Sequence, residues 1–243
     1  MTAGAPGRWL LLAAVLLLHG CGGAPVAPVQ DLSARPHSRS HSGYHVVRRG
    51  ETLYSISFTY GYDYREVARW NGIHSPYRIY PGQKLRMRPP AHTARRAPRH
   101  TAEPRHQTRT VRRAPSHSRT VTAWQWPTSG PVLHAYSATD PGKKGIDIGG
   151  KSGQPVLASA GGEVVYSGSG LIRFGKLIII KHNQTYFSAY AHNRKLLVKE
   201  GMKVRAGQEI AEMGSTGATR TMLHFEIRRN GKPVDPLRYL PRR

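Results

Sequence analysis

The sequence predicts an α+β chain in which a small β-α-α-β module precedes a larger domain of mostly antiparallel strands. Three observations support this fold class. Apolar residues recur at helical spacing only in a short region, residues 53 to 71. From residue 121 onwards, strand-like runs alternate with Gly-rich turns every ~8 to 12 residues, which is typical of an all-β domain. Between these parts lies a basic segment with almost no apolar residues, which cannot bury a core.

The N-terminus predicts export. Arg8 precedes an apolar run from Trp9 to Leu18, which is too short to span a bilayer but fits the centre of a signal peptide. The run ends in Leu-His-Gly-Cys, and Cys21 is the single cysteine of the chain. This pattern resembles a bacterial lipobox, which implies that Cys21 is lipidated and, because Gly22 follows it, that the protein lies at the periplasmic face of the outer membrane. The alternative is an ordinary cleaved signal with an incidental cysteine.

The charge balance favours anionic partners. Lys and Arg number 37 against 13 Asp and Glu, which gives a formal net charge of +24. Export makes nucleic acid an unexpected partner and leaves cell-wall carboxylates and lipid head groups. A single cysteine also excludes an internal disulfide.

The small module carries three sequence marks in order. They are Gly-Glu-Thr-Leu, Asn-Gly-Ile and Pro-Gly-Gln-Lys-Leu, the last at residues 81 to 85. In this order they resemble a LysM module, a family that binds the N-acetylglucosamine glycan of peptidoglycan or chitin between two loops. The resemblance implies that the glycan-binding residues are Gly50, Glu51, Thr52, Leu53, Asn71, Gly72 and Ile73. The alternative is that these residues serve only to form the fold.

Composition then divides the chain into five parts. We expect a lipoprotein signal peptide at residues 1–20, a flexible tether at 21–43, the LysM module at 44–88, a disordered basic linker at 89–120, and a folded domain at 121–243. The linker is self-repelling and therefore extended, and it serves as a spacer or as a second contact with anionic polymer.

The C-terminal domain resembles the LytM/lysostaphin-type zinc endopeptidases, which cut the peptide cross-links of peptidoglycan. Their pattern is H-x-G-x-D, then Tyr-x-His, then H-x-H-F-E. Here Asp147, His192 and His224 stand at family positions, whereas Lys143 replaces a zinc-ligand histidine and Met222 replaces a catalytic histidine. A lysine ammonium has no lone pair to donate to a metal. The resemblance with these two losses implies a degenerate site that holds no metal or other cofactor and is not enzymatic; a zinc metalloendopeptidase with an unusual ligand set is the alternative.

The whole arrangement narrows the resemblance further. A lipobox, a LysM module, a basic linker and a degenerate LytM domain, in that order, resemble the NlpD-type murein hydrolase activators of Gram-negative bacteria. That family implies a groove that engages an N-acetylmuramoyl-L-alanine amidase and turns it on for septal wall splitting and daughter-cell separation. We expect the groove to be lined by Lys143, Tyr166, Tyr190 and Arg220. A third possibility is a wall-binding lipoprotein without a regulatory role.

Overall fold

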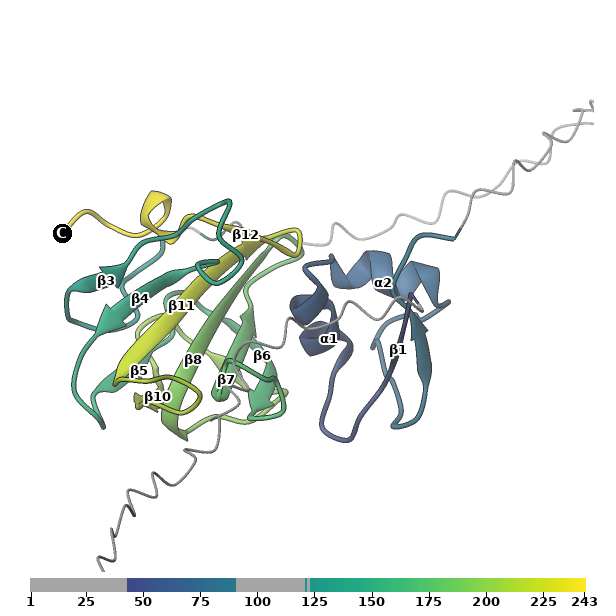
Figure 1. Cartoon of the computed structure of the whole chain (residues 1–243), viewed down its shortest axis with the longest axis horizontal. Coiled ribbons are helices and arrows are strands. Elements are labelled where there is room, and N and C mark those ends of the chain that lie inside the picture. The colour runs from purple at the N-terminus through teal and green to yellow at the C-terminus, as the bar shows by residue number, and fades with distance from the viewer. Residues whose placement is uncertain (1–42, 91–120, 122) are drawn as a thin grey trace, which may run out of the picture. The chain divides into compact units, whose positions relative to one another are not determined.

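The computed structural model describes residues 43–90, 121 and 123–243 (Figure 1). The predicted signal peptide, the predicted lipidation site Cys21, and almost all of the predicted tether and linker lie outside these residues. Within the described part of the chain, no helix is both long enough and apolar enough to cross a membrane.

The N-terminal module has the predicted β-α-α-β order. It consists of β1 (Tyr44–Val46), α1 (Leu53–Tyr60), α2 (Tyr64–Trp70) and β2 (Lys84–Arg86). The two strands pair antiparallel, with Tyr44 opposite Arg86. The predicted fold of this module is therefore confirmed.

Local sequence explains where both helices begin. Thr52 precedes α1, and its hydroxyl accepts a hydrogen bond from the backbone N–H of Ser55 while Ser55 Oγ accepts one from the N–H of Thr52. This reciprocal pair satisfies two amides that the first turn leaves unpaired. Asp63 precedes α2 in the same way and accepts from the backbone N–H of Arg65. Gly61, with a φ of 71°, ends α1, because a left-handed residue satisfies the last carbonyls of a helix.

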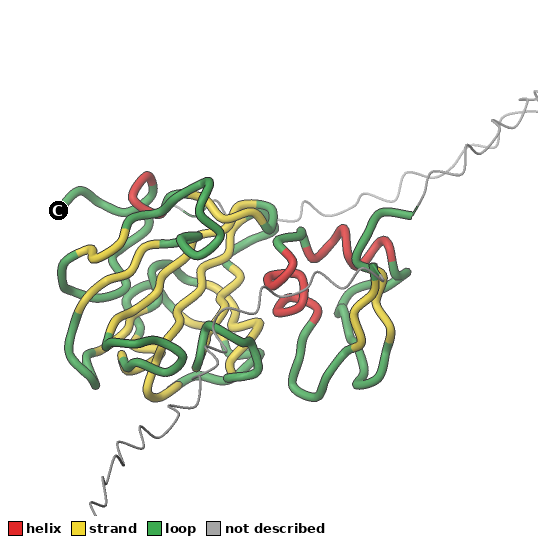
Figure 2. Tube along the Cα trace, in the orientation of Figure 1, coloured by secondary structure: helices red, strands yellow, loops and turns green. Residues whose placement is uncertain are grey.

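The C-terminal domain is built of short and medium strands, as predicted. Its strands are β3 (Val132–His134), β4 (Ile146–Gly149), β5 (Pro155–Leu157), β6 (Gly162–Gly168), β7 (Lys176–Lys181), β8 (Tyr186–Leu196), β9 (Lys203–Val204), β10 (Glu209–Met213), β11 (Met222–Arg229) and β12 (Lys232–Val234). A single 3-10 turn, η2 (Pro236–Arg238), follows them. Figure 2 shows strands running through this domain and helices confined almost entirely to the N-terminal module.

All strand pairs in the C-terminal domain are antiparallel. The main path of the sheet is β3-β4-β11-β8-β7-β6-β9, while β10 pairs with β5 and β8, and β12 pairs with β11. The main core is a cluster of fully buried side chains that includes Ile148 on β4, Ile178 on β7, Tyr190 on β8 and Phe225 on β11. This core fixes the central strands β4, β11 and β8, which carry the residues of the candidate site.

Candidate functional site

Three neighbouring strands bring the predicted site residues Asp147 and His224 into line with His134. In the sheet register, Asp147 on β4 lies opposite His134 on β3 and opposite His224 on β11. The chain approaches β11 closely at Gly145, the residue just before β4, where an added Cβ would lie 2.2 Å from the carbonyl oxygen of Phe225. Only glycine fits there, which gives a packing reason for the Gly in the Lys-Lys-Gly-Ile-Asp segment.

A chain of charge-assisted hydrogen bonds joins these strands. His134 Nδ1 donates to Asp147 Oδ2 at 3.0 Å, and His224 Nδ1 donates to Asp147 Oδ1 at 2.6 Å. On its other side, His224 Nε2 donates to Glu226 Oε1 at 3.2 Å. Glu226 in turn accepts from Arg228 Nε at 2.7 Å. Since His224, Glu226 and Arg228 alternate along β11, they share one face of the strand.

The protonation states follow from this arrangement. Burial disfavours a charged His224, but its hydrogen bonds to Asp147 and Glu226 outweigh that cost and raise the pKa of His224 to about 9. Burial also opposes ionisation of Asp147 and Glu226, yet their cationic neighbours lower the pKa of both carboxyls. His224 is therefore an imidazolium held between two carboxylates, and both of its nitrogens are used as donors.

We expect the stability of the domain to fall at alkaline pH through His224. Its folded pKa of about 9 lies above the ordinary 6.5, so its contribution is complete below about pH 6.5 and is lost as the pH rises through about 9. Urea unfolding between these pH values measures the loss. Asp147→Asn removes one acceptor and should move the NMR titration midpoint of His224 downward. A wild-type midpoint below 7 would contradict the assignment.

His192 lies beside this network but outside it. Its ring centroid is 6.0 Å from that of His224, its Nδ1 donates to the carbonyl oxygen of Thr216, and its backbone has a φ of 66°. Burial lowers the pKa of His192, so this ring is neutral at pH 7. Phe174 covers the same region, with its ring centroid 6.1 Å from that of His224.

The two substituted positions lie four residues before Asp147 and two residues before His224 along the chain. Lys143 is exposed, and its ammonium lies 3.7 Å from Asp140 Oδ2. Met222 is half-buried at the first residue of β11, opposite Gly149. Arg220, the predicted charged rim residue, is exposed just before that strand.

The donor set does not fit a catalytic zinc ion. Such a site needs three protein ligands with available lone pairs. Asp147 and His224 supply two such groups, but at the third family position Lys143 offers an ammonium, which has no lone pair to donate.

Two predicted groove residues are corrected by the structure. Tyr190 is fully buried in the main core, and its hydroxyl accepts from the backbone N–H of Ser159 at 2.8 Å. Tyr166 is 2% exposed, and its hydroxyl accepts from the backbone N–H of Gly170. Both rings therefore hold the domain together and offer no surface to a partner. Alternation of side chains along β6 and β8 follows from the sequence, but it does not predict which face of each strand is buried.

The predicted glycan residues form two turns around one small core. Leu53 is buried in that core and Ile73 packs against it. The Asn71 side chain joins α2 to β2, since it accepts from the N–H of Arg86 at 2.6 Å and donates to the carbonyl of Arg86 at 2.9 Å.

The other glycan candidates have open or partly occupied surroundings. Gly50 and Gly72 have positive φ and open space around them. Thr52 caps α1, as described above, and Glu51 Oε2 accepts from His45 Nε2 at 2.8 Å.

Sequence reasoning did not assign His134, Glu226 and Arg228 to the site. The sequence did contain a signal for Glu226 and Arg228. They lie two and four residues after His224 in the strand-like run HFEIR, and side chains two apart on a strand share a face. His134 could not be found this way, since its approach to Asp147 depends on the pairing of β3 with β4.

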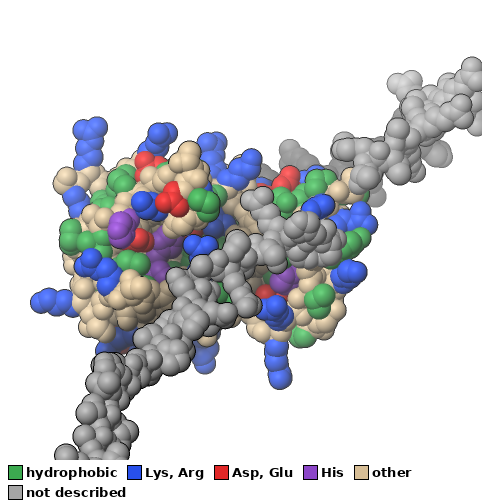
Figure 3. Space-filling model, viewed as in Figure 1, with side chains coloured by type: hydrophobic (Ala, Val, Ile, Leu, Met, Phe, Trp, Pro, Cys, Tyr) green, Lys and Arg blue, Asp and Glu red, His purple; other side chains and the backbone are tan. Residues whose placement is uncertain are grey.

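Positive charge is a property of the surface as well as of the composition. Figure 3 shows Lys and Arg side chains spread over the visible face, with histidine side chains reaching the surface among a few Asp and Glu. Such a surface suits an anionic polymer or an acidic partner.

Both folded parts of the chain are similar to known protein families. Residues 45–88 match the LysM domain, and residues 141–236 match Peptidase family M23. The chain is 44% identical over 276 residues to "Lipoprotein NlpD/LppB homolog" of Pseudomonas aeruginosa, covering 98% of this chain and 93% of that protein. It is 43% identical to "Uncharacterized lipoprotein YgeR" of Escherichia coli, covering 96% of this chain and 91% of that protein.

A further relative carries a functional name. "Murein hydrolase activator NlpD" of Escherichia coli is 38% identical over 263 residues, which cover 84% of this chain and 69% of that protein. The module order, the M23-type sheet and these similarities agree with one another. The chain belongs to the NlpD family of murein hydrolase activator lipoproteins.

Proposed function

We propose that this protein is a non-catalytic lipoprotein that binds peptidoglycan and activates an N-acetylmuramoyl-L-alanine amidase for septal wall splitting. The observation that carries the proposal is the pair of substitutions in the family pattern: Lys143 stands in place of a zinc-ligand histidine, and Met222 stands in place of a catalytic histidine.

Both substitutions remove chemistry that zinc-dependent hydrolysis needs. Lys143 adds a positive charge at the edge of the site, which repels a divalent cation. Met222 has a thioether in place of an imidazole and cannot transfer a proton. What remains is the site of an M23-type domain without its hydrolytic chemistry, and that is suited to recognising another protein.

A dye-release assay on purified peptidoglycan tests this function. We expect the protein alone to release no dye, and a candidate N-acetylmuramoyl-L-alanine amidase to release dye faster when the protein is added. Arg220→Glu should reduce this stimulation, because Arg220 is exposed at the rim, whereas Arg242→Glu serves as an exposed control at the C-terminal end of the chain. Dye release by the protein alone, with stoichiometric zinc, would overturn the proposal and support the zinc endopeptidase alternative.

The LysM module is proposed to supply wall binding through its two turns. We expect residues 44–88 to sediment with insoluble peptidoglycan, and to do so after the stem peptides have been removed, because the ligand is the sugar. The binding should persist at moderate salt, since screening weakens contacts between exposed charges. Sedimentation only at low salt would assign the binding to the basic charge instead.

We further propose that Cys21 carries the lipid and anchors the protein at the periplasmic face of the outer membrane. The sequence motif supports this, as do the names of the relatives, which include "Outer membrane antigenic lipoprotein B" of Haemophilus influenzae. Mass spectrometry of the membrane-extracted protein should find an acylated Cys21. An unmodified, soluble chain would contradict it.

A further inference from the structure

The sheet of the C-terminal domain has two apolar faces. Along β7, Ile178 and Ile180 point into the main core, whereas Leu177 and Ile179 belong to a second buried cluster. We call the side of the sheet that carries this second cluster the outer face. A strand that is apolar on both sides requires cover on both sides, because its exposed face would otherwise lie in water.

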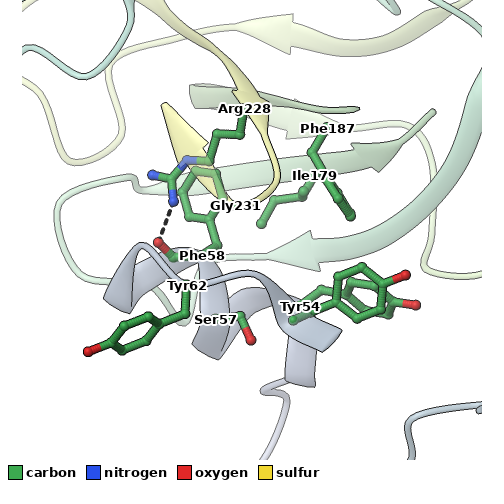
Figure 4. Close-up of a pocket in the computed structure, with 9 residues that line it drawn as sticks. Tyr54, Ser57, Phe58, Tyr62, Ile179, Phe187, Arg228 and Gly231 are labelled. Carbon is green, nitrogen blue, oxygen red and sulfur yellow. Dashed lines mark hydrogen bonds between the residues drawn. The ribbon is translucent and has the colours of Figure 1, made fainter. Parts of the chain in front are cut away.

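The side chains that cover the outer face come from the LysM module. The second cluster includes Phe58 on α1 and Tyr64 on α2. The ring of Tyr64 lies 5.7 Å from that of Phe187 on β8, and the ring of Phe58 lies 5.4 Å from that of Phe174. A cavity of about 20 Å³ remains between α1 and the sheet (Figure 4), which is room for about one water molecule.

Backbone shape also fits this contact. Gly231 lies in the turn between β11 and β12, where an added Cβ would lie 2.3 Å from the carbonyl oxygen of Tyr62. Polar groups are paired as well. Thr52 Oγ1 donates to the carbonyl of Val165 at 3.2 Å, and Tyr64 Oη donates to Gln184 Oε1 at 3.1 Å.

One residue links this contact to the degenerate site. The guanidinium of Arg228 lies over the Phe58 ring, 3.3 Å from its centroid, and donates to the carbonyl oxygen of Phe58. The same guanidinium holds Glu226, which holds His224. The Arg228 side chain is 7% exposed and the Glu226 side chain 1% exposed, so these interactions are shielded from solvent.

We propose that the outer face is the docking surface for this chain's own LysM module, and that docking fixes Arg228 so that the module and the degenerate site are energetically coupled. A change in the position of the LysM module is transmitted to His224 through the side chains of Arg228 and Glu226. This coupling does not require that the site binds an amidase.

NMR on the ¹⁵N-labelled full chain tests the docking. If the module is docked, backbone relaxation gives α1 and β7 the same rotational correlation time. Gly231→Ala should release the module and shorten the correlation time of α1 alone. Gly201→Ala is the matched control, since Gly201 has a similar φ of 85° but open space around it. A module that tumbles faster than the sheet in the wild-type protein would overturn the proposal.

The coupling has its own readout in the same spectra. Phe58→Ala, a change in the LysM module, should shift the imidazole resonances of His224, whereas Tyr80→Ala, at an exposed position of the same module, should leave them in place. Unchanged His224 resonances in Phe58→Ala would overturn the coupling. A melting temperature equal to that of the wild type, measured for each variant, confirms that the module itself remains folded.

Discussion

Arg228→Met is expected to destabilise the C-terminal domain by about 3–5 kcal/mol, because it leaves the buried carboxylate of Glu226 without its cation. The substitution keeps most of the side-chain volume, so the loss reports the charge pairing together with the contacts that Arg228 makes with the Phe58 ring and carbonyl oxygen. Glu226 would retain only the longer hydrogen bond from His224. Urea unfolding at pH 7 measures the free energy directly.

The neighbouring arginine provides the control. Arg229 follows Arg228 on β11 but is exposed, so Arg229→Met should change the free energy of unfolding by less than about 0.5 kcal/mol. Adding Glu226→Gln to Arg228→Met removes the orphaned charge and should recover part of the loss. Equal effects of the two arginine substitutions would show that the Glu226 pair is not stabilising.

Tyr190→Ala is expected to cost about 3–5 kcal/mol, since it empties a large volume in the main core. It also leaves the backbone N–H of Ser159 and the hydroxyl of Ser188 without the Tyr190 hydroxyl, which lies 2.8 Å from each. Any loss of amidase stimulation in this variant would therefore follow from unfolding. Thermal and urea denaturation check the effect.

Two variants separate the contributions of Tyr190. Tyr190→Phe keeps the ring and removes only the hydroxyl, and should cost about 1–3 kcal/mol. Tyr80→Ala, at a side chain that is 66% exposed, should cost little. A Tyr190→Ala domain that unfolds like the wild type would contradict the placement of this ring in the core.

The fold was predictable because its signals are local. The Gly-Glu-Thr and Asn-Gly turns of the LysM module are sequence signals, and so are the regularly spaced strands of the C-terminal domain. Lys143, Asp147, His192, Met222 and His224 could be named because motif spacing identifies positions along single segments.

The chemistry of the site was less predictable because it depends on strand pairing. The imidazolium state of His224 requires Asp147 on one side and Glu226 on the other, and the first of these contacts joins residues 77 positions apart. The burial of Tyr166 and Tyr190 likewise depends on which elements cover each face of the sheet. Alternation along a strand shows that two faces exist, but not what lies on them.

Gly145 has an evolutionary consequence. The close approach of the chain to β11 keeps a glycine at this position for packing alone, whether or not the site is catalytic. A domain of this shape can therefore lose hydrolysis through side-chain substitutions while its backbone stays under the same constraint. The return path is harder, since it needs Lys143→His and Met222→His together. Loss and recovery of catalysis are thus unequal steps, which favours keeping such a domain in a non-hydrolytic role once it has one.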